Sequence, residues 1–265
     1  MKNEELVTLS LPYYDKTDRT VRVYVPAHNE SESFPVIYMT DGQNLFDEES
    51  STMGCWHTRE AVKAEYESCG KAAIIVGIHN DGHPMQRTNE LTPGSIGKLF
   101  LPPQVPEELR RMADPQGEKF DDFLINTVMP AIEARFPIKP GRENTAVCGS
   151  SSGGLQMFYT GVSHPDIFSA AGAFSPCFML YEPGDLANWI NSRLGGEMPF
   201  MYLFAGGVDD IEQPIRHSTE FTYNIMKERC SDDKLKLVIS PECRHHESSW
   251  EAVFKDFLHI FLNKY

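Results

Sequence analysis

The chain reads Thr-Ala-Val-Cys-Gly-Ser-Ser-Ser-Gly-Gly-Leu-Gln-Met-Phe from residue 145 to residue 158. Its first four residues are typical of a buried strand, and its last five begin an apolar helical pattern. A serine with glycines two positions before and two positions after it can occupy a sharp turn from strand to helix, which exposes its hydroxyl. Only Ser151 has glycines at both positions. The stretch therefore predicts a nucleophile at Ser151, although the same pattern also occurs in ordinary loops.

Eight short runs rich in β-branched or aromatic residues predict strands at residues 6–11, 20–25, 36–40, 72–78, 145–149, 169–174, 200–205 and 236–239. Helical apolar spacing lies between several of them and again at the end of the chain. The first two runs are expected to pair as a hairpin. The remaining alternation predicts an α/β fold with a mostly parallel central sheet of about eight strands, flanked by helices on both faces.

The length of 265 residues, with 41% hydrophobic residues, predicts a single domain over 1–265. Residues 81–116 contain six prolines, which is too many for a regular element, although residues 107–112 could form a helical turn or two. A long insertion of this kind predicts a lid or a substrate wall. Pro130 lies inside a helical pattern and should kink that helix.

The formal net charge of −14 argues against a nucleic-acid partner, because the chain would repel phosphate. No run of eighteen apolar residues and no secretory leader is visible, so we expect a cytoplasmic chain that makes no membrane contact. The six cysteines form no CxxC pair, and we expect reduced thiols.

A serine nucleophile needs a base, because its hydroxyl must lose a proton during attack. His245 and His246 follow the strand predicted at 236–239, and Asp209 and Asp210 follow the one at 200–205. The order serine, acid, histidine is that of an α/β-hydrolase, in which the later two groups follow later strands. Either aspartate could also be a turn residue or a helix cap. A metal site is disfavoured because there is no HExxH spacing, and no cofactor is expected.

Charge on a carbonyl oxygen during acyl transfer requires fixed N–H donors. One donor should be the backbone N–H of Ser152, the residue after the nucleophile. The second is expected after the third strand, where we assign the backbone N–H of Gln43. The sequence Asp41-Gly42 fits an ordinary turn equally well.

Several longer motifs accompany these residues. They include Tyr-Met-Thr-Asp-Gly-Gln-Asn-Leu-Phe at 38–46, Gly-Ser-Ser-Ser-Gly-Gly at 149–154, His-Pro-Asp-Ile-Phe at 164–168 and Phe-Ser-Pro at 174–176. In these motifs the chain, from about residue 20 to its end, resembles the esterase D family of α/β-hydrolases. That family includes feruloyl and acetylxylan esterases of carbohydrate esterase family 1 and S-formylglutathione hydrolases.

The resemblance implies a catalytic triad. The family's serine maps to Ser151, and its acid, three residues after a strand-ending glycine, maps to Asp209. Its histidine lies five residues before a tryptophan, which selects His245. His246 takes the place of the family's usual asparagine, so a second histidine could compete. The implied reaction is two-step acyl transfer without a metal or cofactor.

The resemblance also implies the substrate class, a small-molecule or oligosaccharide ester such as a feruloyl or acetyl ester of a carbohydrate. Trp56 and Trp250 could stack on such a substrate, but we expect both in the core. An acyltransferase or a thioesterase would use the same triad and stays open as an alternative. A non-enzymatic binding module is less favoured, because such relatives usually lose a triad residue.

Overall fold

The computed structural model describes residues 2–14, 17–80, 82–100 and 107–264. Eight strands form one sheet in the order β1-β2-β4-β3-β5-β6-β7-β8. They are β1 (Glu5–Pro12), β2 (Asp18–Val25), β3 (Val36–Met39), β4 (Ile74–Ile78), β5 (Thr145–Ser150), β6 (Ala170–Phe174), β7 (Phe200–Ala205) and β8 (Leu235–Ile239). Each predicted strand is present, and the ends differ by no more than two residues from those expected.

The strand directions confirm the predicted sheet. β1 and β2 form an antiparallel hairpin that pairs Glu5 with Val25, and β2 also runs antiparallel to β4. From β4 to β8 every neighbouring pair is parallel. The carboxyl ends of these strands therefore meet along one edge of the sheet, where an α/β protein places its reactive groups.

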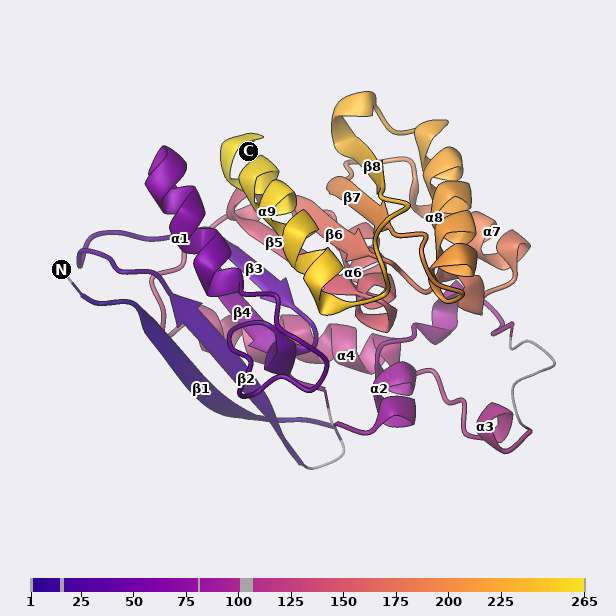
Figure 1. Ribbon diagram of the computed structural model, residues 1–265, viewed down its shortest axis with the longest axis horizontal. Helices are drawn as coiled ribbons and strands as arrows, with labels where there is room; N and C mark the ends of the chain where they lie inside the picture. The colour runs from indigo at the N-terminus through magenta and orange to yellow at the C-terminus, as the bar shows by residue number, and fades with distance from the viewer. Residues whose placement is uncertain (1, 15–16, 81, 101–106, 265) are drawn as a thin grey trace.

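Helices cover both faces of the sheet (Figure 1). They are α1 (Thr58–Cys69), α2 (Pro84–Glu90), α3 (Glu107–Arg111), α4 (Gly117–Phe123), α5 (Met129–Glu133), α6 (Ser152–Ser163), α7 (Pro183–Arg193), α8 (Glu212–Lys227) and α9 (Glu247–Lys264). α1 and α9 lie side by side in front of the sheet in Figure 1, and α6 packs on β5 and β6 behind it. Among the described residues, none of these helices combines the length and apolar character that crossing a bilayer requires.

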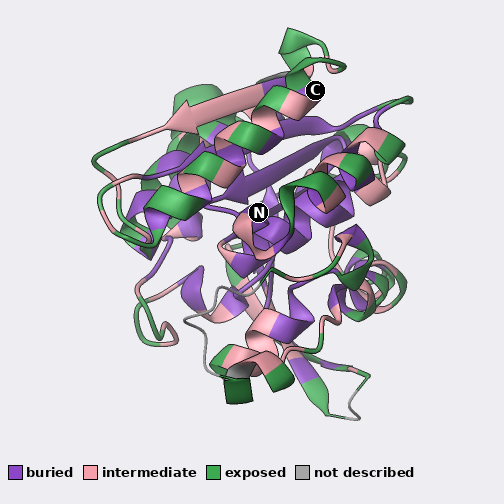
Figure 2. Cartoon of the chain, turned by 90° about the vertical axis from the view of Figure 1, so that its right-hand side faces the viewer, coloured by how far each residue is buried: buried purple, intermediate pink, exposed green. Residues whose placement is uncertain are grey.

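The central strands form the core. Every residue of β3, β4, β5, β6 and β7 is buried. Figure 2 shows these buried strands running between helices whose outer surfaces are exposed. A parallel sheet covered on both faces needs such continuous apolar runs, which explains why its strands are clear in the sequence.

The proline-rich segment is more regular than expected. The segment 81–116 contains α2, in which Pro84 is the first residue and its missing N–H costs no helical bond. It also contains α3, close to the helical turn expected at 107–112, while residues 81 and 101–106 lie outside the described residues. The interruption expected at Pro130 takes the form of a π-helical turn (Leu124–Val128) between α4 and α5.

A close backbone contact fixes the loop after β3. Gly42 begins a short 3₁₀ turn, η1 (Gly42–Asn44), and a Cβ added to it would lie 2.4 Å from the carbonyl carbon of Gly77 in β4. Backbone atoms cannot move aside as a flexible side chain can. Only glycine therefore allows the loop to lie this close to the sheet.

Gly42→Ala is expected to lower the free energy of unfolding by about 1–3 kcal/mol, because the methyl group forces the loop away from β4. Urea unfolding followed by circular dichroism measures the loss. Gly184→Ala is the control, since nothing lies within 4 Å of its added Cβ, and it should change stability by less than about 0.5 kcal/mol. Equal stability of the two variants would contradict the proposed steric role.

Candidate active site

Ser151 lies on a strained turn between β5 and α6. Its φ of 60° and ψ of −127° are rare for a residue with a side chain. The turn is held by a 2.9 Å hydrogen bond from the Ser151 N–H to the Phe174 carbonyl. A Cβ on Gly153 would lie 2.1 Å from the hydroxyl oxygen of Thr40, so this position requires glycine. The local geometry is the strand-turn-helix that the glycine spacing predicts.

His245 is brought to Ser151 from the far end of the chain. Its Nε2 lies 3.0 Å from the Ser151 hydroxyl oxygen. The ring packs perpendicular to the indole of Trp250, with 5.0 Å between centroids. Trp250 is itself fixed, because its Nε1 donates to the Ser175 hydroxyl oxygen at 3.0 Å. The imidazole is therefore held in a position from which it can accept the serine proton.

The carboxylate on the other side of the imidazole belongs to Glu212. Its Oε1 lies 2.8 Å from His245 Nδ1, and its Oε2 accepts the backbone N–H of Gly206 at 2.9 Å. The side chain has no exposed surface. Both oxygens thus have partners, which a buried carboxylate needs.

Asp209, expected at this place, contacts the backbone instead of the imidazole. Its Oδ2 accepts the N–H of His245 at 2.9 Å, and its Oδ1 accepts the N–H of Glu212 at 2.8 Å. Burial acts to raise its pKa, but these two N–H groups, together with the charge of His245 and the Ile211 N–H, lower the pKa. Asp210 is exposed to solvent. The structure thus corrects the expected contact: Asp209 positions the loop of His245, and Glu212 holds the ring.

A signal for Glu212 was present in the sequence. Residues 209–212 read Asp-Asp-Ile-Glu, so three carboxylates follow β7. Asp209 accepts the N–H of Glu212, three residues further along, as a residue that caps the start of a helix does. The side chain of Glu212, the first residue of α8, is then free to face His245. His246, the competing histidine, is exposed, and its Nδ1 lies 3.0 Å from the hydroxyl of Ser248.

The two predicted oxyanion donors lie at the starts of helices. Ser152 is the first residue of α6, and Gln43 is the middle residue of η1. The first N–H groups of a helix have no acceptor within that helix, so both can point at a ligand. Gln43 and Ser151 line the same hollow. The assignment of these two N–H groups to an oxyanion remains a prediction.

No sequence motif marks Cys177 as part of the site. Its Sγ lies 3.5 Å from the Ser151 hydroxyl oxygen, and its backbone N–H donates to the Ser151 carbonyl at 3.3 Å. Burial raises the pKa of the thiol, which favours the neutral S–H form. The thiol is therefore a weak neutral contact of the hydroxyl and does not compete with Ser151 as a nucleophile.

Ser151 and His245 open into a hollow of about 610 Å³. Trp56 and Trp250 form part of its wall, but they are only 3% and 4% exposed and pack among core aromatic rings, as expected. Five residues of the proline-rich segment supply another part of the wall: Gly82, His83, Pro84, Arg87 and Thr88. A role of the segment as a lid or substrate wall stays a prediction.

An ion pair between the buried Asp41 and the half-buried Arg87 lies in this wall. Arg87 binds both carboxylate oxygens of Asp41, at 2.6 and 2.7 Å, and Asn80 donates to the same carboxylate at 2.7 Å. Burial alone would raise the Asp41 pKa, but Arg87 and Asn80 together lower it. The pair joins α2 to the loop that carries Gln43.

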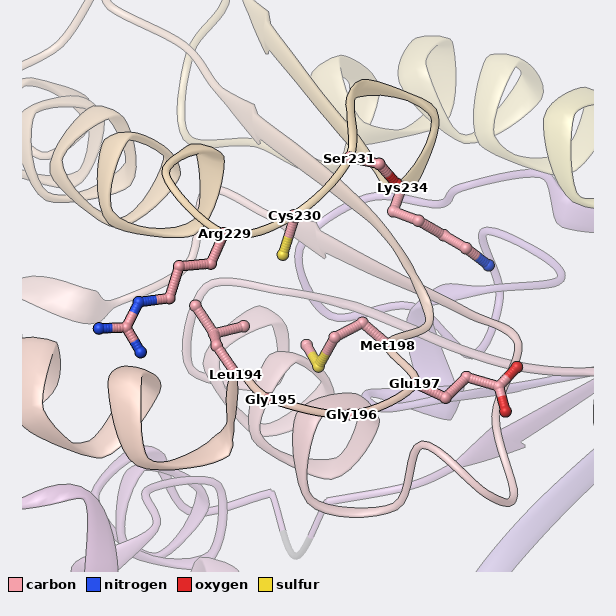
Figure 3. A pocket seen from close by; sticks show the side chains of 9 residues that line it. All are labelled: Leu194, Gly195, Gly196, Glu197, Met198, Arg229, Cys230, Ser231 and Lys234. Atoms are coloured by element: carbon pink, nitrogen blue, oxygen red, sulfur yellow. The ribbon is translucent and has the colours of Figure 1, made fainter.

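A second hollow, of about 700 Å³, lies away from these groups (Figure 3). It is formed by the connections that lead into β7 and β8, and the side chains of Met198 and Cys230 point toward one another across it. It therefore lies at the amino ends of the strands, opposite the edge that carries Ser151. Within the described part of the chain, no group of three or more His, Cys, Asp or Glu side chains could hold a metal ion.

Comparison with known proteins finds a family of esterases and a related esterase. The model of the family described as putative esterase matches residues 14–193. A siderophore triacetylfusarinine C esterase from Aspergillus fumigatus is 30% identical over 174 residues, which cover 62% of this chain and 54% of that protein.

Two solved structures share the fold. The siderophore hydrolase EstA from Aspergillus nidulans superposes with a TM-score of 0.73 at 17% identity, over 97% of this chain and 94% of that one. The ferulic acid esterase AmCE1/Fae1A from Anaeromyces mucronatus gives a TM-score of 0.65 at 19% identity, over 98% and 91%. At these identities the likeness establishes the α/β-hydrolase fold.

Arg87→Met should destabilise the protein by about 3 kcal/mol at pH 7, because it leaves the buried Asp41 carboxylate unpaired. In the natural protein the lowered pKa of Asp41 contributes stability above about pH 4, and this stability is lost as the pH falls through the lower folded value. In the variant, burial leaves the pKa raised, so the charged form costs stability at neutral pH.

The difference between the two unfolding free energies should therefore shrink as the pH falls from 7 through the lowered pKa of Asp41, because below that pKa the carboxyl is protonated in both proteins. Urea titrations across this range measure it. Arg216→Met, which removes a half-exposed pair with Glu220 on the surface of α8, should cost less than about 1 kcal/mol. A difference independent of pH would contradict this electrostatic role.

Proposed function

The chain belongs to the family of putative esterases, and from this premise we propose that it hydrolyses carboxylic esters through an acyl-enzyme on Ser151. The observation that carries the proposal is the continuous hydrogen-bonded chain from Ser151 through His245 to Glu212, with contacts of 3.0 and 2.8 Å. A strained serine, a held imidazole and a buried carboxylate form the arrangement that nucleophilic acyl transfer needs.

In the first step the Ser151 oxygen attacks the ester carbonyl carbon while its proton passes to His245 Nε2. The imidazole becomes positively charged, and the buried Glu212 carboxylate stabilises this charge through Nδ1. The contact at Nδ1 also fixes the tautomer, because the proton there faces Glu212 and leaves the lone pair on Nε2 facing Ser151.

The carbonyl oxygen becomes negative as the new bond forms. The backbone N–H groups of Ser152 and Gln43 are proposed to stabilise it. Collapse of this intermediate breaks the bond to the alcohol, which leaves with the proton from His245. Water then attacks the acyl-enzyme with His245 as base. The carboxylic acid product is released and the free Ser151 hydroxyl is regenerated.

The proposed substrate is an acylated carbohydrate fragment, such as a feruloyl or acetyl ester. The shared fold with a ferulic acid esterase and the open hollow beside Ser151 support this class. A siderophore ester is a second candidate, favoured by the similarity to the Aspergillus fumigatus esterase. Comparison of kcat/KM for methyl ferulate, acetylated xylo-oligosaccharides and triacetylfusarinine C separates the two classes.

Transfer to an acceptor other than water, or attack on a thioester, would use the same triad. Product analysis with an added alcohol distinguishes transfer from hydrolysis, because a transferase yields a new ester and a hydrolase yields the free acid. Comparison of p-nitrophenyl acetate with an acetyl thioester tests for thioesterase activity.

Ser151→Ala and His245→Ala are each expected to lower kcat by about 10⁶-fold, by the precedent of other serine hydrolases. The measurement is hydrolysis of p-nitrophenyl acetate, with a fluorophosphonate probe to report the reactive serine. The probe should label the natural protein at Ser151 and should not label Ser151→Ala. Full activity in purified Ser151→Ala would overturn the proposed nucleophile.

Glu212→Gln should lower kcat by about 10⁴-fold, because an amide can favour the wrong imidazole tautomer and cannot stabilise the imidazolium. Asp209→Asn should cost about tenfold or less, since it weakens only hydrogen bonds from backbone N–H groups. The same ester assay compares the two variants. A larger loss in Asp209→Asn than in Glu212→Gln would reverse the two assignments.

A further inference from the structure

Glu247 is a buried carboxylate beside the proposed triad that the mechanism above does not use. It is the first residue of α9, two positions after His245, and only 6% of its surface is exposed. Its Oε1 accepts a hydrogen bond of 3.0 Å from Nδ2 of Asn44, which is equally buried. Asn44 is the last residue of η1 and follows Gln43 directly. This bond therefore links the histidine loop to the turn of the proposed oxyanion donor.

Asn44 is held in place on its own side of the bond. Its backbone N–H donates to the Asp41 carbonyl at 2.9 Å, and its carbonyl accepts the N–H of Trp56 at 2.8 Å. Its Oδ1 accepts the backbone N–H of Thr52 at 3.3 Å. The side-chain oxygen is therefore used locally, and the amide nitrogen is the atom that faces Glu247.

The two segments also touch at a second point. A Cβ added to Gly54 would lie 3.3 Å from the Glu247 Cβ and 3.2 Å from the His246 ring. The segment after η1 thus packs directly on the start of α9. Contact and hydrogen bond together leave little room for the two loops to shift relative to one another.

The buried surroundings of Glu247 strengthen its hydrogen bond with Asn44. Burial, and to a smaller extent Asp41, raise the pKa of Glu247, while its own helix-start N–H, His246 and Asn44 act in the opposite direction. The charge of Glu247 also acts to raise the pKa of Arg87. In such a site of low water content, a hydrogen bond is electrostatically stronger than at the surface, and its loss costs more.

We propose that Glu247 is a positioning residue for the esterase reaction, whose hydrogen bond to Asn44 holds the Gln43 N–H at a set distance from Ser151 and His245. The inference rests on the proposed function, since it assigns Glu247 a role in the same reaction. Glu247 itself touches no reacting atom in this mechanism. It acts through the position of η1.

The energetic consequence falls on the transition state. An oxyanion donor stabilises charge only where its N–H meets the developing oxygen, so a displacement of less than 1 Å weakens it. Ground-state binding of a neutral ester depends much less on this donor. Loss of the Glu247 bond should therefore lower kcat and leave KM nearly unchanged.

The test is Glu247→Ala, assayed with p-nitrophenyl acetate and with an arylboronic acid, which forms a tetrahedral adduct on a reactive serine. We expect kcat to fall roughly 30-fold, less than the 10²–10³-fold for outright removal of a donor. The inhibition constant of the boronic acid should rise by a similar factor, while KM stays within about threefold. Glu247→Gln keeps an oxygen acceptor for Asn44 and should recover most of the loss.

Two further variants keep the test decisive. Asn44→Ala removes the bond from the other side and should reproduce the loss, and the double variant should be little worse than either single one. Glu251→Ala, one turn further along α9 in an ion pair with His57, is the control and should retain full activity.

The possible results lead to different conclusions. Unchanged kcat in Glu247→Ala, a loss of kcat without any rise in the boronic acid constant, or a loss that Glu247→Gln fails to recover would each overturn the role of Glu247. Failure of the natural protein to react with a fluorophosphonate at Ser151 would instead refute the proposed function.

Discussion

The backbone at Ser151 is the constraint from which the arrangement of the site follows. A residue with a side chain held at positive φ is strained, and the surrounding contacts must over-determine it. Here the strand β6 accepts the Ser151 N–H, Cys177 donates to its carbonyl, and Gly153 allows Thr40 to lie against the turn. Contacts from β6, from the loop after it and from the end of β3 therefore hold Ser151 so that its hydroxyl projects from the edge of the sheet.

Once the hydroxyl is fixed, the parallel sheet determines where its partners can come from. Gln43 follows β3, Glu212 follows β7 and His245 follows β8, so each lies beyond the carboxyl end of a strand. Every residue of β3 and β7 is buried, whereas the loops after the three strands differ in length and composition. The histidine loop is held by Asp209, which accepts the His245 N–H, and by the packing of the His245 ring on Trp250. A rigid sheet edge with individually anchored loops gives the precise spacing that proton transfer requires.

The sequence predicted most of this arrangement, and the family match confirms the predicted esterase class and fold. Strands were clear because buried parallel strands are continuous apolar runs, and the turn was clear because few residues other than glycine fit around it. The carboxylate that contacts His245 was harder to predict from the sequence. Asp209 and Glu212 are three residues apart in the same turn, and only the three-dimensional course of α8 decides which carboxylate reaches the ring.

The contacts of α2 could not be predicted from the sequence, because they also depend on how distant segments meet. Prolines in the segment 81–116 argued against a regular element, but Pro84 starts the helix instead of breaking it. The pairing of Arg87 with Asp41 joins residues 46 positions apart, and no local pattern reports such a contact. Charge pairs of this kind depend on which loops meet at the sheet edge, so they become visible only when the topology is known.

Two ion pairs of α2 attach this part of the wall of the hollow to neighbouring elements. Near the middle of the helix Arg87 forms an ion pair with Asp41, and at its end the buried Glu90 forms an ion pair with Arg19 of β2. The helix is thus attached on one side to the loop that carries Gln43 and on the other to the antiparallel edge of the sheet. The intervening positions, such as Thr88, face the hollow without contacting Ser151, His245 or Glu212 through any described hydrogen bond. Substitutions at such positions can change the lining of the hollow while both ion pairs, and with them the loop that carries Gln43, stay in place.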